Sequence, residues 1–119
     1  MNSQIRNQLI AQLKHIQALL KKSTVLSTKP ITMAQRHYKE PFGIDCMEPS
    51  QWLYHIYTEY AIKALNQEQW EIFASIEGFT FFFSYTWKEL DHPDTEQIIA
   101  KLQEFEDTCV AHIPQKRSK

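Results

Sequence analysis

The sequence of 119 residues contains only two glycines and two cysteines, and it has no long uninterrupted hydrophobic segment. So few glycines disfavour folds that need tight turns or glycine-rich phosphate loops, and they favour an α-helical protein. Two cysteines fit free thiols in a reducing cytoplasm better than a disulfide framework. No apolar segment approaches the roughly 20 residues of a membrane span, and the polar-interrupted start is not a secretory signal. We therefore expect a cytoplasmic protein without membrane contact.

The length is that of one domain, and a hydrophobic content of 43% is enough for a core. We expect a single helical domain over residues 1–113 and a basic, disordered tail over residues 114–119. The net charge is +6 over residues 1–40, −10 over residues 41–113 and +3 over residues 114–119. A nucleic-acid partner would explain this asymmetry, and so would a basic first helix packed against acidic helices. The pI of about 6.5 favours the second explanation.

Hydrophobic periodicity predicts four helices and hence an all-α, small four-helix bundle. The first helix covers residues 4–22, with Ser3 as its N-cap, and the second covers residues 49–66. The third opens after Gly78, and the last starts at a break over residues 91–93 and ends before Pro114. The aromatic segment 79–87 also alternates like a strand, but a lone strand would have nothing to pair with.

The segment between the first two predicted helices, residues 23–48, shows no sustained period and is long for a connection within a compact domain. It contains enough apolar residues to be ordered along the bundle, and we expect this order at least from Tyr38 onward. The stretch STVLSTKP, residues 23–30, is predicted to be the most mobile part of the connection.

The stretch PFGIDCMEPSQWL, residues 41–53, is predicted to form the turn that starts the second helix. Glu48 precedes a proline and should lie outside the helix, while Pro49 should take the first helical position. We expect Gly43 to supply an unusual backbone angle. The carboxylate of Asp45 is expected to accept from the backbone N–H of Met47 or Glu48.

Three apolar side chains of this stretch, Phe42, Met47 and Trp52, should anchor the turn by burial. Loss of a buried Trp costs about 3–5 kcal/mol, so Trp52→Ala should lower the melting temperature sharply. We expect Asp45→Asn to lower it only mildly. The motif is therefore interpreted as mainly structural.

The same stretch resembles the YqcC-like family of small bacterial proteins. The resemblance rests on a pattern made of Pro41, Phe42, Asp45, Met47, Glu48, Pro49, Trp52 and Leu53, with a weaker match at residues 91–93. It implies an all-α, four-helix domain and a link with tRNA pseudouridine synthase C. Residues 58–61 depart from the family, which often carries an Ile-Pro-Arg-Met-like run after Trp-Leu.

Catalytic and metal-binding alternatives find little support in the residues. A pseudouridine synthase needs an Asp in a base-gripping catalytic domain, and Asp45 is the one candidate with motif support. No catalytic residue is therefore assigned. Zinc would need the set Cys46, His55, Cys109 and His112, but Cys109 falls within the apolar face of the last helix. We expect no metal and no cofactor.

The aromatic third helix is the clearest functional signal. Two of its side chains, Phe81 and Tyr85, remain outside the core once the others face inward, which we predict for Phe79, Phe82, Phe83, Trp87 and Leu90. Exposed aromatic residues mark partner or self-association surfaces, unless the 23–48 connection covers them.

Two functions follow from these patterns. The first is a non-enzymatic protein that acts through protein–protein contact, in RNA-modification machinery if the resemblance holds. The second is an accessory or catalytic component of tRNA pseudouridine synthesis with weak tRNA binding. Its RNA contacts would be the basic residues of the first helix, Arg6, Lys14, Lys21 and Lys22.

Overall fold

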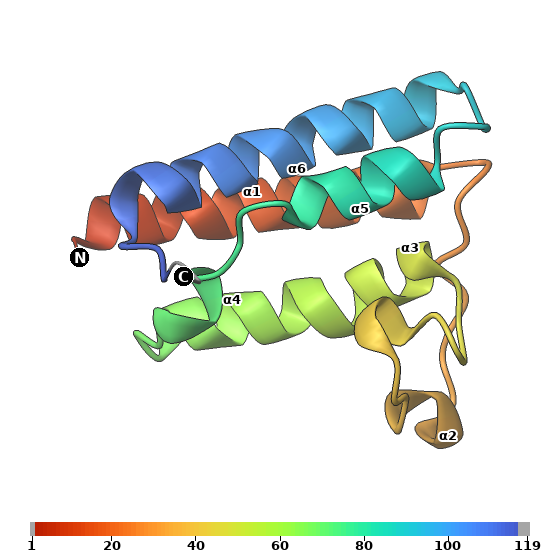
Figure 1. The fold of residues 1–119 in the computed structure, drawn as a ribbon, viewed down its shortest axis with the longest axis horizontal. Helices are drawn as coiled ribbons and strands as arrows, with labels where there is room; N and C mark the ends of the chain where they lie inside the picture. The colour runs from red at the N-terminus through yellow and green to blue at the C-terminus, as the bar shows by residue number, and fades with distance from the viewer. Residues whose placement is uncertain (1, 117–119) are drawn as a thin grey trace.

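A computed structural model describes residues 2–116, and every regular element in this range is helical. The longer helices are α1 (Ser3–Lys22), α4 (Thr58–Asn66), α5 (Phe79–Thr86) and α6 (Pro93–His112). The shorter ones are α2 (Met33–Arg36), η1 (Pro41–Gly43), α3 (Pro49–Trp52), η2 (Leu53–Tyr57) and η3 (Glu71–Phe73). Figure 1 shows their arrangement, which confirms the predicted all-α bundle. Within the described residues, no helix is both long and apolar enough to cross a membrane.

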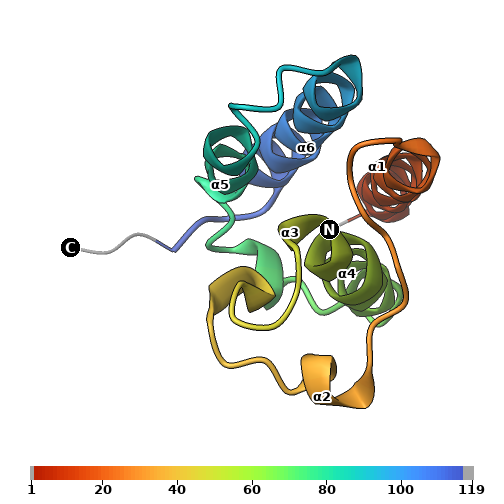
Figure 2. The same cartoon turned by 90° about the vertical axis from the view of Figure 1, so that its right-hand side faces the viewer.

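The bundle is organised around α1, which packs against both α6 and α4, while α5 packs against α6. Figure 2 shows these helices nearly end-on. The period of three or four residues predicts an apolar stripe on α1 that starts at Ile5, which is half-buried. The other four members are fully buried, and they are Leu9, Leu13, Ile16 and Leu20. The predicted N-cap was wrong by one residue. The side chain of Asn2 accepts from Ile5 N at 2.9 Å, and Ser3 is already helical.

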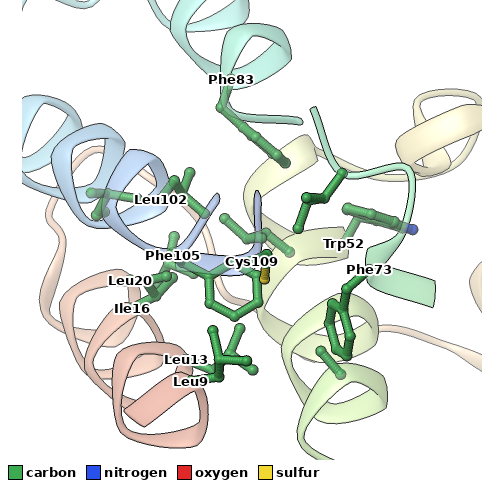
Figure 3. Close-up of a cluster of buried hydrophobic side chains, with 14 of the residues drawn as sticks. Leu9, Leu13, Ile16, Leu20, Trp52, Phe73, Phe83, Leu102, Phe105 and Cys109 are labelled. Atoms are coloured by element: carbon green, nitrogen blue, oxygen red, sulfur yellow. The ribbon is translucent and has the colours of Figure 1, made fainter. Parts of the chain in front are cut away.

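The core lies where α1 and α6 face α4 and the segment that follows it. The buried apolar residues of α6 lie in one stripe, on the face that the sequence predicts, and are Ile98, Leu102, Phe105 and Cys109. Figure 3 shows Leu102, Phe105 and Cys109 converging with the α1 stripe and with Phe73 of η3. The rings of Phe73 and Phe105 meet edge to face at 6.0 Å. The short η3 turn, which the sequence did not predict, therefore belongs to the core.

The predicted second helix, residues 49–66, is continuous but contains a π-helical turn, η2, between α3 and α4. Pro49 takes the first helical position, and Glu48 stays extended with φ −73° and ψ 146°. The backbone N–H of Glu48 donates to Gln51 Oε1 at 3.0 Å, which closes the helix start. The π-helical turn has one more residue per hydrogen-bonded loop than an α-helix, and such turns are often found at functional sites.

The long connection is attached to the bundle earlier than the sequence predicts. Three consecutive backbone carbonyls accept hydrogen bonds from side chains of α3 and η2. The pairs are Ser27 with Ser50 Oγ (2.6 Å), Thr28 with His55 Nε2 (2.8 Å) and Lys29 with Gln51 Nε2 (3.2 Å). The order expected at least from Tyr38 onward thus extends back to residues 27–29, because the polar face of α3 and η2 holds them.

The start of the connection is fixed by α6. The carboxylate of Asp94, in the first turn of α6, accepts from Thr24 N and from Ser23 Oγ, both at 3.0 Å. The backbone N–H of Thr24, together with the Ser23 hydroxyl, lowers the pKa of Asp94 below its ordinary value. An ionised Asp94 therefore ties the end of α1 to the beginning of α6.

The first residues of the predicted tail, 114–116, are held against the bundle. Lys116 N donates to Ala74 O at 2.7 Å, and Gln115 Nε2 donates to Phe73 O at 3.1 Å. These bonds hold residues 114–116 against η3, because they satisfy carbonyls at its end. The rest of the predicted tail, residues 117–119, lies outside the described residues.

Candidate interaction surface

The aromatic helix α5 is fixed at its N-terminus by a carboxylate from α6. Gly78, its N-cap, has a φ of +92°, a backbone conformation that favours glycine. The carboxylate of Glu106 accepts from Gly78 N at 3.1 Å and from Thr80 N at 2.8 Å. A negative charge is favourable at this end of a helix because of the helix dipole. Glu106, which is buried, therefore sets the position of α5 on α6.

The inner face of α5 joins the core largely as predicted. Phe83 and Trp87 are buried, and Phe82 is half-buried under Phe42, whose ring stacks on it at 3.8 Å. The prediction for Leu90 was wrong, since its side chain is 46% exposed. The helix ends at Thr86, and the turn that follows moves Leu90 out of the helical stripe.

The outer face of α5 carries Phe81 and Tyr85, which are 70% and 61% exposed. Their rings stack at 6.3 Å with an angle of 29°, and Lys88 Nζ lies 4.2 Å from the centre of the Tyr85 ring. The 23–48 connection does not cover either ring. We call this pair the α5 aromatic face. Adjacent exposed rings on a helix whose other side is buried are typical of a contact surface.

The chain on either side of the α5 aromatic face is acidic. Lys88 supplies one cation at the Tyr85 ring, whereas three exposed carboxylates lie within six residues of the face in the chain, and they are Glu77, Glu89 and Asp91. They would repel the phosphates of a nucleic acid, and they suit a partner with basic residues around an apolar centre.

The helix-entry motif has the geometry of a folded turn. Gly43 is buried with φ +64°, a backbone conformation that favours glycine, and a Cβ there would press tightly on Met47 and Trp52 at 3.1 Å. Met47 and Trp52 are buried, as is Leu53. The Trp52 ring meets the edge of Phe42 at 5.0 Å. Pro41 opens the η1 turn that carries Phe42.

The predicted role of Asp45 as a forward cap was wrong. Its two carboxylate oxygens accept from Lys39 N at 3.1 Å and from Glu40 N at 3.3 Å, residues that precede the motif. The Lys39 bond is the main reason that the pKa of Asp45 lies below its ordinary value. Asp45 therefore fastens the preceding chain to the motif. With both oxygens bound to backbone amides, it has the surroundings of a structural acceptor.

The four basic residues of α1 have different surroundings. Arg6 is half-buried, and its guanidinium lies 3.7 Å from the Glu68 carboxylate. Lys14, Lys21 and Lys22 are exposed. The helix also packs against α6, which carries more acidic than basic residues. α1 thus lies beside an acidic helix, as the packing explanation of the charge asymmetry requires, and presents three lysines to solvent.

The residues considered for zinc are not brought together. Cys46 is exposed in a loop, while Cys109 is buried in the core, where burial raises the pKa of its thiol to about 12. A thiol with this pKa stays protonated at neutral pH and is a poor ligand. No group of three or more His, Cys, Asp or Glu side chains suited to a metal occurs within residues 2–116.

Sequence reasoning missed Glu106, the residue that places α5. A signal was available, because Glu106 stands four residues after Leu102 and three before Cys109, on the edge of the apolar stripe. A charged residue at such a position needs a partner. The sequence did not indicate which partner, since the bonded amides lie 26 and 28 residues away.

Comparison with known proteins gives one result. No curated protein and no solved structure matches the chain. A family model described as tRNA pseudouridine synthase C matches residues 8–108, a range that includes most of α1, the helix-entry motif, α5 and most of α6. The chain therefore belongs to the family described as tRNA pseudouridine synthase C.

Proposed function

We propose that this protein is non-enzymatic and acts through protein–protein contact, with the α5 aromatic face as its contact surface. The observation that carries the proposal is the exposure of Phe81 and Tyr85, whose side chains are 70% and 61% exposed. They belong to a helix whose N-terminus is bound by the Glu106 carboxylate. Aromatic residues on a rigid element make effective binding anchors because little conformational entropy is lost when they are covered.

The energy available at this surface is sufficient for a specific contact. An aromatic side chain buries on the order of 150–250 Å², and burial yields about 25 cal/mol per Å². Since both rings are mostly exposed in the free protein, covering each would yield on the order of 3 kcal/mol. Part of this energy offsets the cost of association, so the two rings would form the centre of a larger interface.

The family description suggests a partner in tRNA modification. A protein that binds tRNA carries basic residues around its site, because phosphate contacts supply most of the affinity. The acidic residues that flank the α5 aromatic face in the chain, Glu77, Glu89 and Asp91, are complementary in charge to the basic surface of such a tRNA-binding partner.

Co-purification from the native host tests the proposal. The bait is the full chain, compared with Phe81→Ser and with Met33→Ser, a control whose side chain is 72% exposed on α2. We expect a tRNA-modifying enzyme to be enriched with the wild type and with Met33→Ser, and to be lost with Phe81→Ser. Equal recovery by all three, together with a strict monomer in light scattering at micromolar concentration, would refute the proposal.

A second function, weak tRNA binding, is favoured by the exposure of Lys14, Lys21 and Lys22 on α1. Binding that neutralises several phosphates should weaken steeply as salt rises from about 50 to about 200 mM. Replacing the three lysines by glutamine should lower both the affinity and the salt dependence. The absence of tRNA binding at the lower salt concentration would remove this function.

A further inference from the structure

A groove of about 430 Å³ lies between α2 and the helix formed by η2 and α4. Its volume is within the range of small-molecule sites, about 300–1,000 Å³. One wall comes from Arg36 and Tyr38, and the other comes from His55, Ile56, Tyr60 and Lys63. The views in Figures 1 and 2 place α4 between α2 and α5. The groove is therefore separate from the α5 aromatic face.

The wall made by α2 is held in place although the helix has a single turn. Thr32 N donates to Gln35 Oε1 at 2.7 Å, and Gln35 N donates to Thr32 Oγ1 at 3.1 Å. This reciprocal pair is a capping box. The amide of Gln35 also donates to Cys46 O at 3.0 Å, which links α2 to the helix-entry motif. Arg36 therefore lies on a turn that is held both by its capping box and by the hydrogen bond from Gln35 to Cys46 O.

The opposite wall begins at the π-helical turn η2, which contains both His55 and Ile56. The Nε2 atom of His55 lies 2.8 Å from the carbonyl oxygen of Thr28. A carbonyl can only accept, so Nε2 carries the proton in this bond. The other ring nitrogen, Nδ1, is then the one that a ligand in the groove can use. Such a role agrees with the frequent occurrence of π-helical turns at functional sites.

The groove combines two cations with aromatic rings. Arg36 and Lys63 are exposed and come from elements far apart in the sequence, while Glu59 adds one carboxylate. Tyr60 is 53% exposed and Tyr38 is half-buried. Guanidinium and ammonium groups bind phosphate by charge-assisted hydrogen bonds. A partly exposed tyrosine is a surface on which a nucleobase can stack.

We propose that this groove binds a nucleoside monophosphate, either as a free nucleotide or as one unit of single-stranded RNA. Arg36 and Lys63 hold the phosphate, and Tyr60 stacks on the base. Glu59 and Nδ1 of His55 accept hydrogen bonds from hydroxyl or N–H groups of the ligand. The site does not depend on the proposed protein contact, because it shares no residue with the α5 aromatic face.

The test is a titration of the full chain, labelled with ¹⁵N, with uridine 5′-monophosphate while amide resonances are followed. We expect shifts to be concentrated at α2 and η2–α4, with weaker binding of uridine and of inorganic phosphate, which each offer half of the contacts. Arg36→Gln and Lys63→Gln should each weaken binding about tenfold. Both side chains are exposed, so the variants should keep the fold. Lys101→Gln, the same charge change on α6, should leave the affinity within about twofold.

A short oligouridylate, titrated in the same way, separates the two sources of the ligand. Tighter binding than the mononucleotide at the same resonances assigns the groove to RNA, and equal binding assigns it to the free nucleotide. The proposal is overturned if the mononucleotide leaves the groove resonances unshifted, or if Lys101→Gln weakens binding as much as Lys63→Gln. It is also overturned if inorganic phosphate binds as well as the mononucleotide.

Discussion

Replacing Glu106 by alanine should loosen the attachment of α5 to the bundle. Two backbone N–H groups, those of Gly78 and Thr80, would lose acceptors at 3.1 and 2.8 Å. A hydrogen bond to a charged group contributes about 1.5–3 kcal/mol. The gain is partly offset because the carboxylate no longer has to be desolvated, and neighbouring losses are not additive. We therefore expect Glu106→Ala to lower the free energy of unfolding by about 3–4 kcal/mol. Glu106→Gln keeps one acceptor and should cost about 1–2 kcal/mol.

Urea denaturation followed by circular dichroism gives the free energy, and hydrogen exchange shows where protection is lost. Glu104→Ala is the matched control, since its side chain is 55% exposed on the same helix, where it pairs with Lys101. Exposed substitutions of this kind stay within about 0.5 kcal/mol. The amides of α5 should lose protection in Glu106→Ala before those of α1. If Glu106→Ala were no more destabilising than Glu104→Ala, the role of Glu106 in fixing α5 would be refuted.

Three further predictions concern the helix-entry motif, acid stability and the thiols. Trp52→Ala should lower the free energy of unfolding by about 3–5 kcal/mol, because the buried ring leaves a cavity; an unchanged melting temperature would contradict its anchoring role. The pKa values of Asp45 and Asp94 lie below the ordinary 3.8, so the ionised carboxylates stabilise the folded protein above pH 3.8. This contribution to the free energy of unfolding is lost as the pH falls through the lowered pKa values. The double variant to asparagine should flatten this acid loss in a series of urea titrations. Thiol labelling of the native protein should modify Cys46 and spare Cys109 until unfolding, and early labelling of Cys109 would show that its helix opens locally.

Periodicity was sufficient to predict the long helices. The α1 stripe and the α6 stripe repeat every three or four residues over about five turns, so their buried faces could be assigned with little ambiguity. Pro49 fixed the start of the second helix through the conformational limits of proline and of the residue before it. Phe83 and Trp87 were placed in the core for the same geometric reason as the stripes.

Features that depend on contacts between distant segments could not be predicted. Asp45 can accept from amides on either side, and the structure bends the preceding chain back to it, which no local pattern indicates. Across the π-helical turn the buried positions pass from Leu53 to Thr58, a step of one residue more than a regular turn takes, and the 3.6-residue period of an α-helix over residues 49–66 does not predict this shift. The groove combines α2 with α4, and α2 is too short for a periodic signal, so Arg36 did not stand out.

The attachment of residues 27–29 has a consequence for how the sequence can change. Ser50, Gln51 and His55 bind backbone carbonyls there, so the side chains of Thr28 and Lys29 take no part in these bonds. Every amino acid offers the same carbonyl. Substitutions at these two positions are therefore compatible with the attachment, whereas an inserted or deleted residue would shift each carbonyl away from its donor. The attachment of residues 27–29 therefore tolerates substitutions at Thr28 and Lys29 better than insertions or deletions.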